Sequence, residues 1–242
     1  MPAHPKKAFV LAAGMGSRMR PLTDNCPKPL LVVDGKSMLD RALDALAETG
    51  VEDVVVNTHY LGEMIAAHLR LCKHPRITIS PEPELLDTAG GVKKNLAFFG
   101  NDPFYVLNAD VLWTNGRTPT LQAMADKWDD ATMDVLILLH EAADVPAYAG
   151  HGDYHLAEGS DRPVFAKGTG QKANYIFAGP RIAHPRLFDD TPDGKFGFLQ
   201  LFHKAEKAGR LAALRHDGEW HHVGTPEAFA ETNLIFAKKK AV

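Results

Sequence analysis

A glycine-rich stretch that directly follows a short apolar run limits what this chain can fold into more than any other feature. Residues 8–11 have the apolar character of a buried strand, and LAAGMGSRMRPLTDNCPKPL spans residues 11–30. Glycines allow backbone N–H groups to approach phosphate oxygens without an intervening Cβ atom. A strand followed by Gly-x-Gly therefore predicts a phosphate-binding loop, of which three kinds must be distinguished.

Two of the three kinds fail on their residues. A dinucleotide-binding loop needs a third glycine three positions after the second, and Met19 stands there. Asp34 lies about where the ribose-binding acid of such a fold would fall. In such a fold a helix lies between the glycines and this acid. The prolines at positions 21, 27 and 29 leave no room for that helix. A Walker loop needs a closing Gly-Lys-Ser/Thr, which is absent, so the stretch predicts a nucleotidyltransferase loop.

Each residue type in this loop suits a nucleoside triphosphate. Gly14 and Gly16 bring backbone N–H groups to the phosphates, and Arg18 supplies a planar fork of donors. Pro27-Lys28-Pro29 predicts a stiff extended frame that holds the charge of Lys28 where negative charge develops. The alternative, a generic glycine turn with surface arginines, does not explain why all these residues follow one another after a strand.

Apolar runs alternate with helical patterns along the first half of the chain. We expect strands at 8–11, 53–57, 77–80 and 104–107, and helices at 37–49, 61–71 and 91–99. This alternation implies parallel strands joined by right-handed crossovers. The second half predicts strands at 134–140, 152–156, 163–167, 174–179, 211–215 and 220–223, and helices at 121–128, 198–208 and from 225 onward.

The predicted architecture is a single α/β domain over residues 1–242. Its mostly parallel central sheet gains antiparallel strands in the second half. Residues 1–115 form the nucleotide-binding half, and residues 116–242 form the half that holds the second substrate.

Composition excludes several classes of protein. A formal net charge of -3 over 242 residues argues against a dedicated nucleic-acid binder. No apolar run approaches the roughly 20 residues that span a bilayer, and MPAHPKK lacks the apolar run of a signal peptide. Cys26 and Cys72 have no zinc-binding spacing and favour a reducing compartment. We therefore expect a cytoplasmic monomer or small homo-oligomer with no nucleic-acid or membrane partner.

The glycine stretch resembles the signature of the sugar-1-phosphate nucleotidyltransferases, or NDP-sugar pyrophosphorylases, which is approximately L-x-x-G-x-G-x-R-x-x-P-L-T followed by P-K-P-L. DTAGGV at 87–92, NAD at 108–110 and WHHVGTPE at 220–227 extend the resemblance along most of the chain. Together with HPRLF at 184–188, they make the chain most similar to the bacterial N-acetylmuramate-1-phosphate uridylyltransferases.

This resemblance implies a Rossmann-like three-layer fold and a metal-dependent enzyme. The enzyme would transfer a nucleotidyl group from an NTP, with UTP favoured, to a sugar-1-phosphate, with N-acetylmuramate 1-phosphate favoured, in cell wall recycling. Mannose-1-phosphate guanylyltransferase, or another hexose-1-phosphate nucleotidyltransferase, is the alternative among enzymes. A non-catalytic protein that binds sugar nucleotides and serves in regulation is the alternative from another class.

The resemblance also assigns residues to the two substrates. The catalytic residues are Arg18, Lys28 and Asp110. The nucleotide-binding residues are Leu11, Ala12, Ala13, Gly14, Met15, Gly16, Ser17, Arg18, Lys28, Glu82, Ala89 and Gly90. The sugar-phosphate-binding residues are Asn108, Gly152, Asp153, Asn174 and Gly179. The family's Glu-Lys-Pro triplet, whose lysine meets the acceptor phosphate, is absent, and Lys167 is the candidate to replace it.

The residue Glu82 does not settle which base the bound nucleotide carries. It lies near the position where relatives carry a base-reading glutamine, and a carboxylate there would accept hydrogen bonds from uracil or from guanine. A solvated acid in the PEPE segment explains the residue equally well.

The metal site is expected at Asp110 and His222. Asp110 follows a predicted strand, and a carboxylate at the carboxyl end of a parallel strand can ligate Mg²⁺ bridged to phosphates. A turn aspartate is the alternative. His222 stands where relatives carry the second acidic ligand, and imidazole suits Mn²⁺ better than Mg²⁺. His222 therefore binds a softer metal, contacts phosphate through water, or leaves Mg²⁺ to Asp110.

Overall fold

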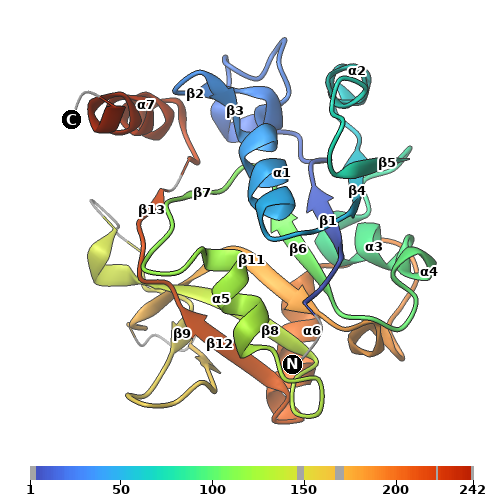
Figure 1. Cartoon of the computed structure of the whole chain (residues 1–242), viewed down its shortest axis with the longest axis vertical. Helices are drawn as coiled ribbons and strands as arrows, with labels where there is room; N and C mark the ends of the chain where they lie inside the picture. The colour runs from blue at the N-terminus through green and yellow to red at the C-terminus, as the bar shows by residue number, and fades with distance from the viewer. Residues whose placement is uncertain (1–3, 146–149, 167–171, 222, 241–242) are drawn as a thin grey trace.

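The computed structural model describes residues 4–145, 150–166, 172–221 and 223–240 (Figure 1). The predictions for Lys167 and His222 fall outside these ranges. Within them, a nine-stranded sheet runs in the order β10-β9-β11-β6-β1-β4-β5, with β8 joined to β11 and β12 joined to β8. Helices cover both faces of this sheet, which confirms the predicted three-layer α/β fold (Figure 1).

The first half of the chain builds the parallel part of the sheet. The central strand β1 (Lys7–Leu11) pairs in parallel with β4 (Asp53–Thr58) on one side and with β6 (Phe104–Asn108) on the other. Strand β5 (Arg76–Pro81) continues the sheet beyond β4. The carboxyl ends of β1, β4 and β6 therefore meet at one edge, as the alternation of strands and helices predicts.

The second half adds antiparallel strands. The long strand β11 (Tyr175–Ala183) runs antiparallel to β6 and to β8 (Val135–Glu141), and β12 (Leu211–Arg215) runs parallel to β8. The short strands β9 (Tyr154–His155) and β10 (Val164–Phe165) lie beyond β11.

The strand predicted at 220–223 is shorter and does not join the large sheet. It forms β13 (Trp220–His221), which pairs with β7 (Leu112–Trp113) in a separate two-stranded sheet.

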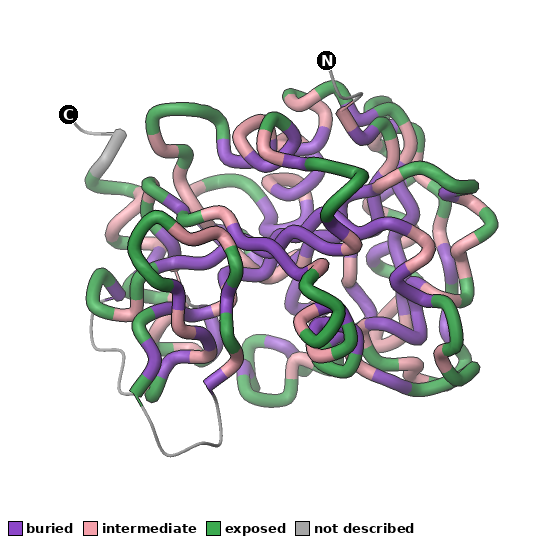
Figure 2. The backbone as a smooth tube through the Cα atoms, turned by 90° about the horizontal axis from the view of Figure 1, so that it is seen from below, coloured by how far each residue is buried: buried purple, intermediate pink, exposed green. Residues whose placement is uncertain are grey.

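Alternation along the strands divides the core into two layers. Ala8 and Val10 of β1 pack on one face and Phe9 packs on the other, and β4 and β6 alternate in the same way. The first face is covered by α1 (Met38–Glu48), α2 (Gly62–Leu69) and α5 (Thr120–Lys127). The second face is covered by α3 (Asp87–Lys93), α4 (Leu96–Phe99) and α6 (Phe198–Lys207). Figure 2 shows the buried strands between more exposed helices.

Local signals explain where α1 and α7 begin. The Asp40 N–H donates to the Ser37 hydroxyl at 3.0 Å, so Ser37 caps α1 as its sequence predicts. Helix α7 (Pro226–Lys240) follows Thr225, whose hydroxyl accepts from the Ala228 N–H at 3.3 Å. In the described ranges, no helix combines the length and the apolar character that crossing a membrane requires.

Helix α7 also ties the end of the chain to its beginning. It packs on the hairpin of β2 (Val32–Val33) and β3 (Lys36–Ser37). The hairpin turn holds Asp34 and Gly35 at φ 49° and 77°, a conformation that the Asp-Gly pair adopts readily. The Asp34 N–H donates to the Asn233 side chain of α7 at 3.1 Å.

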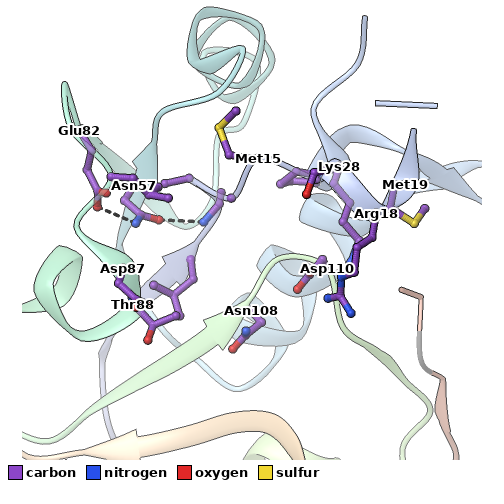
Figure 3. A pocket seen from close by; sticks show the side chains of 18 of the residues that line it. Met15, Arg18, Met19, Lys28, Asn57, Glu82, Asp87, Thr88, Asn108 and Asp110 are labelled. Atoms are coloured by element: carbon purple, nitrogen blue, oxygen red, sulfur yellow. Dashed lines mark hydrogen bonds and ion pairs between the residues drawn. The ribbon is translucent and has the colours of Figure 1, made fainter. Parts of the chain in front are cut away.

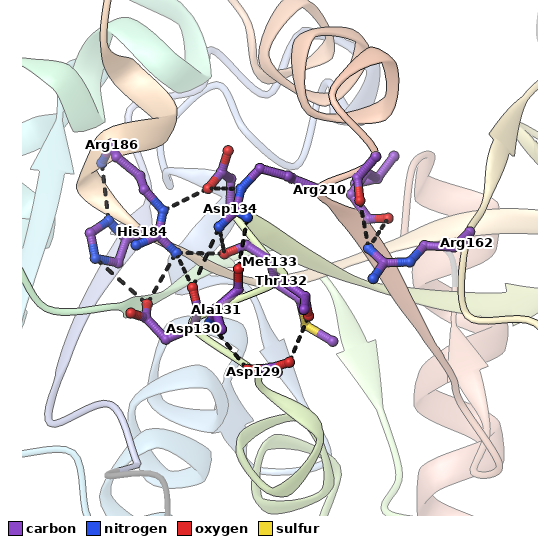
Figure 4. Close-up of polar contacts among 12 residues, drawn as sticks. Asp129, Asp130, Ala131, Thr132, Met133, Asp134, Arg162, His184, Arg186 and Arg210 are labelled. Atoms are coloured by element: carbon purple, nitrogen blue, oxygen red, sulfur yellow. Dashed lines mark hydrogen bonds and ion pairs between the residues drawn. The ribbon is translucent and has the colours of Figure 1, made fainter.

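A polar cluster closes the amino-terminal edge of β8 and β12 (Figure 4). Arg186 Nε and Arg210 Nε both donate to Asp134 Oδ1, at 2.6 and 2.7 Å. Arg186 Nη2 also reaches the Asp130 carboxylate at 3.1 Å and the Met133 carbonyl at 2.7 Å. Burial opposes ionisation of Asp134, but the hydrogen bonds from Arg210 and Arg186 outweigh it and lower the pKa of the carboxyl group.

Candidate active site

A cavity of about 480 Å³ opens at the carboxyl ends of β1, β4 and β6 (Figure 3). Its lining includes the start of the glycine stretch: Leu11, Ala12, Ala13, Gly14, Met15, Gly16, Ser17, Arg18 and Met19. The rest of the lining comes from other segments: Lys28, Pro29, Asn57, Glu82, Leu85, Asp87, Thr88, Asn108, Asp110, Lys195 and Gly224. In open α/β sheets, ligands bind at this edge.

The glycine loop is held from beneath by the next strand. The Ala12 N–H donates to Asn57 Oδ1 at the end of β4, at 2.8 Å. Gly16 adopts φ 61°, and a Cβ atom there would lie 3.1 Å from the Thr23 side chain. The Thr23 hydroxyl donates to the Gly16 carbonyl at 2.9 Å. Nothing lies within 4 Å of the Cβ position of Gly14, so the cavity reaches the backbone there.

Lys28 and Asp110 form an ion pair inside the cavity (Figure 3). Lys28 Nζ lies 2.7 Å from Asp110 Oδ2, and the lysine is buried while the aspartate side chain keeps 37% of its surface exposed. Lys28 does not sit in the extended frame that the prolines predict. It begins the 3-10 helix η2 (Lys28–Leu30), where Pro29 is tolerated because the first turn of a helix needs no N–H donor at that position.

Glu82 is not the solvated loop acid that composition alone allows, because only 3% of it is exposed. Its Oε1 accepts from Asn57 Nδ2 at 2.8 Å, and its Oε2 accepts from the Leu86 N–H at 3.0 Å. A Cβ atom on Gly91 would lie 2.4 Å from Glu82 Oε1, so a larger residue there would displace the carboxylate. Glu82 thus orients Asn57, which in turn holds Ala12 of the glycine loop (Figure 3).

The TAGG segment belongs to helix α3, which begins at Asp87 and not at Gly91 as predicted. Ala89 and Gly90 both donate their N–H groups to the Phe196 carbonyl at 3.0 Å. A Cβ atom on Gly90 would lie 2.1 Å from the Gly194 carbonyl oxygen, so close packing explains glycine inside this helix. Neither Ala89 nor Gly90 lines the cavity, whereas Asp87 and Thr88 do.

The residues predicted to bind the sugar phosphate do not all gather at the cavity. Among the residues that the structure describes, Asn108 lines it, but Gly152, Asp153, Asn174 and Gly179 do not. Asp153 Oδ2 accepts from the Phe177 N–H at 3.0 Å. Gly152 adopts φ 72°, and a Cβ atom there would lie 2.5 Å from the Ala173 carbonyl oxygen. Both residues therefore have structural roles where β9 meets β11.

Comparison with known proteins identifies the family. Residues 7–239 match the nucleotidyl transferase family. The chain belongs to this family. As a nucleotidyl transferase, it is 39% identical to N-acetylmuramate alpha-1-phosphate uridylyltransferase of Caulobacter vibrioides, over 93% of this chain and 94% of the relative. It is 34% identical to the protein of the same name from Neisseria meningitidis, over 90% of this chain and 93% of the relative.

More distant relatives share the fold. A crystal structure of UDP-glucose pyrophosphorylase complexed with UDP-glucose superposes with a TM-score of 0.80 at 19% identity, over 97% of this chain and 99% of that chain. Mannose-1-phosphate guanylyltransferase catalytic subunit beta of Xenopus tropicalis is 28% identical over 92% of this chain, which covers 62% of that relative.

The sequence did not single out every residue that this nucleotidyl transferase brings to the cavity. Asn57, Leu85 and Lys195 were missed, whereas Asp87, Thr88 and Gly224 belong to the motifs DTAGGV and WHHVGTPE that the sequence singled out. Asn57 carried a usable signal, because a polar residue ends an otherwise apolar strand at the edge where ligands bind. Lys195 lies in a loop after residue 190, and nothing in its neighbourhood sets it apart from other surface lysines.

The expected metal site rests on Asp110. The carboxylate faces the cavity and is partly exposed, so it can reach a bound cation. Mg²⁺ is commonly held by one or two carboxylates together with substrate phosphates, so one accessible aspartate fits such an ion. No group of three His, Cys, Asp or Glu side chains in the described residues is arranged to hold a metal.

The His221 ring contacts Glu219, with 3.1 Å between His221 Nε2 and Glu219 Oε2. It packs against Phe236 of α7 with 5.1 Å between the ring centroids. His222, the other predicted ligand, lies outside the described residues.

Proposed function

We propose that this nucleotidyl transferase moves a uridylyl group from UTP to N-acetylmuramate 1-phosphate and releases pyrophosphate. The cavity carries this proposal, because it joins the glycine loop, Lys28 and Asp110 at one edge of the sheet. The choice of substrates is supported by the two relatives named N-acetylmuramate alpha-1-phosphate uridylyltransferase, which match this chain over nearly their whole lengths.

The reaction needs positioning and charge neutralisation rather than a covalent intermediate. An oxygen of the sugar phosphate attacks the α-phosphorus of UTP in line, and the bond to the bridging oxygen of pyrophosphate breaks. The backbone of residues 14–17 and the Arg18 guanidinium hold the β- and γ-phosphates. Lys28 neutralises the charge that develops on the α-phosphate.

Lys28 is ready for this task because its ammonium group is buried and fixed. Its Nζ has three donors, and Asp110 takes one of them at 2.7 Å. The other donors can turn to phosphate oxygens without any movement of the lysine backbone. Burial in the cavity wall strengthens that interaction, since water screens it less.

Asp110 is the residue that would hold a divalent cation, and Mg²⁺ is the ion we propose, with Mn²⁺ as the alternative. Such an ion would neutralise phosphate charge and hold the phosphates in place. The carboxylate also holds Lys28, so it organises this part of the cavity on its own account.

The nucleotide base is selected at the wall formed by Asn57 and Glu82, across the cavity from Lys28 and Asp110 (Figure 3). Glu82 accepts two hydrogen bonds from its own chain, so its carboxylate acts on the base chiefly by fixing Asn57 and residues 82–86. We propose that this wall accommodates uracil.

A substrate matrix tests the proposal. Purified chain with Mg²⁺ is incubated with each of the four NTPs and with N-acetylmuramate, N-acetylglucosamine, mannose or glucose 1-phosphate, and pyrophosphate release is measured. UTP with N-acetylmuramate 1-phosphate should give the highest kcat/KM. Preference for GTP with mannose 1-phosphate would instead identify the guanylyltransferase alternative.

Binding measured on the same samples tests the non-catalytic alternative. If a nucleotide raises the Tm but no pair of substrates releases pyrophosphate, the chain is a binding protein and the proposal is wrong.

The role of His222 is tested by comparing the rate of His222→Asp with that of the native chain in Mg²⁺ and in Mn²⁺. A gain in the Mg²⁺-dependent rate shows that histidine weakens an enzyme, and a loss shows that histidine is a working part.

A further inference from the structure

A buried arginine stands directly behind the cavity. Arg181 lies near the end of β11 with 1% of its surface exposed, and its guanidinium lies over the rings of Phe198 at 4.1 Å and Phe177 at 5.6 Å. Its Nη1 donates to the Gly179 carbonyl at 2.7 Å and to Asn108 Oδ1 at 2.9 Å. Its Nε has no hydrogen-bond partner, and no carboxylate in the described residues forms an ion pair with it. The charge is therefore stabilised only by aromatic rings and carbonyl oxygens, and no carboxylate neutralises it.

Such a charge is costly to bury. Desolvation lowers the pKa of Arg181 to about 9, so the group is still a cation at neutral pH. Arginines are almost never fully buried unless they are paired, and an unpaired buried charge carries a large desolvation cost. Charge pairing within the fold therefore does not explain a cation at this position.

The contact with Asn108 supplies a reason. A guanidinium only donates hydrogen bonds, so the Asn108 atom that faces Arg181 must be the carbonyl oxygen. The amide NH₂ group is thereby turned away from Arg181. Asn108 lines the cavity two residues before Asp110 (Figure 3). Arg181 thus orients the Asn108 side chain so that its NH₂ group, and not its carbonyl oxygen, is available to a ligand at this wall. The guanidinium also places positive charge behind that NH₂ group.

We propose that Arg181 is a positioning residue for the acceptor: through Asn108 it presents amide donors, backed by an unpaired positive charge, to an anionic group of the sugar phosphate. This inference rests on the proposed function. It assigns the acceptor, and not the nucleotide, to the wall at Asn108, behind which Arg181 of β11 lies. The anionic group is either the phosphate or the carboxylate of the lactyl ether on N-acetylmuramate.

Arg181→Met tests this role. Loss of the charged donor should raise the KM for the acceptor by about 10- to 100-fold while the KM for UTP changes by less than about threefold. The Tm should change little, because removal of a buried charge offsets the loss of its hydrogen bonds to Gly179 and Asn108. Arg215→Met is the matched control: Arg215 stacks on Tyr175 at 5.6 Å, does not line the cavity, and should leave both KM values unchanged.

Two acceptors distinguish the anions. An equal loss with N-acetylmuramate 1-phosphate and N-acetylglucosamine 1-phosphate assigns the contact to the phosphate, which both share. A loss confined to N-acetylmuramate 1-phosphate assigns it to the lactyl carboxylate. Either outcome supports an anion at this wall.

A double-mutant cycle tests whether Arg181 acts through Asn108. In the Asn108→Ala background, Arg181→Met should raise the acceptor KM much less than it does in the native chain. An unchanged acceptor KM, an equal rise in the UTP KM, or two effects that multiply in full would each overturn the inference.

The proposed function can fail separately. If the native chain turns over no sugar phosphate, calorimetric titration of N-acetylmuramate 1-phosphate into the UTP-bound chain takes the place of KM. Weaker binding to Arg181→Met than to the native chain still supports the inference. Equal binding, or no binding to either, overturns it.

Discussion

Two ion-pair sites lie at opposite edges of the same sheet, and they differ in how completely their charges are matched. At the amino-terminal edge, the Asp134 carboxylate receives donors from Arg186 and Arg210, and backbone carbonyl groups accept further N–H donors of both arginines (Figure 4). At the carboxyl edge, Lys28 meets Asp110 alone, beside an open cavity (Figure 3). The charges of the first site are matched by groups of the chain itself, whereas Lys28 at the second site keeps N–H donors that a ligand can use.

This difference in charge matching predicts that the Asp134 cluster serves stability and that the Lys28–Asp110 pair serves catalysis. A network whose members satisfy one another holds the strands together, so its loss should be felt in the free energy of unfolding. A pair with unused donors in a cavity is poised for an anion, so its loss should be felt in catalysis. Each experiment below tests one side of this contrast.

The largest effect is expected at the carboxyl edge. Lys28→Met should lower kcat/KM by about 100- to 1000-fold, because one fixed donor to the transition state is lost. The free energy of unfolding should barely change, since Asp110 remains partly exposed to water. Steady-state kinetics and urea unfolding measure the two effects. Lys36→Met, which removes an exposed partner of Asp44, is the control, and a similar loss of activity there would break the contrast.

The reverse pattern is expected at the amino-terminal edge. Asp134→Asn leaves two arginines facing each other and should cost about 2–4 kcal/mol of unfolding free energy. The kcat/KM should be unchanged, because the cluster lies at the other end of the strands from the cavity. Asp53→Asn is the control: its bidentate partner Arg76 is exposed, so the cost should stay below about 1 kcal/mol. Impaired catalysis in Asp134→Asn would contradict the assignment.

A smaller effect is expected at the nucleotide wall. In Gly91→Ala, the new Cβ atom would press on Glu82 Oε1 from 2.4 Å and disturb the contact from Asn57 to the glycine loop. The KM for UTP should rise about tenfold, equivalent to about 1.4 kcal/mol. Gly197→Ala meets its nearest atom at 3.4 Å and serves as the control. An unaltered KM for UTP in Gly91→Ala would show that Glu82 does not support nucleotide binding.

The smallest effect is expected on the pH dependence of the free energy of unfolding in acid. The folded-state pKa of Asp134 lies below its ordinary value of 3.8, so its contribution is present above that value and is lost as the pH falls through the lowered pKa. Between about pH 5 and pH 2, native stability should therefore fall more steeply than that of Asp134→Asn. Urea unfolding at successive pH values measures both slopes, and parallel slopes would show that the network does not shift this pKa.

The sequence predicted the parts of the site that depend on short local patterns. The glycine loop and Asp110 reach the cavity because each follows a strand whose apolar run is plain in the sequence. Lys28 also reaches it, although its backbone is a 3-10 turn and not an extended frame. A proline fixes its own φ, but whether the chain around it extends or turns depends on tertiary contacts.

The parts that were missed depend on contacts between distant segments. TAGG reads as a loop because glycine is a poor helix former, yet Gly90 packs against Gly194 and Gly91 packs against Glu82. The sequence leaves Glu82 open between a base-reading acid and a solvated one, and only its contacts with Asn57 and the Leu86 N–H show that it is buried. Arg181 lies beyond the strand predicted at 174–179, and its relation to Asn108 appears only when β11 lies beside β6.

The position of β6 between β1 and β11 also has a consequence for the chain as it is synthesised. Residues 104–108 leave the ribosome well before residues 175–183, which form the partner strand on their other side. At roughly 5–20 residues per second, that edge stays unpaired for several seconds. Its sequence, FYVLN, is uncharged and largely apolar, the kind of open strand that joins neighbouring chains. The interval between these two strands is therefore when a nascent chain is most vulnerable to aggregation.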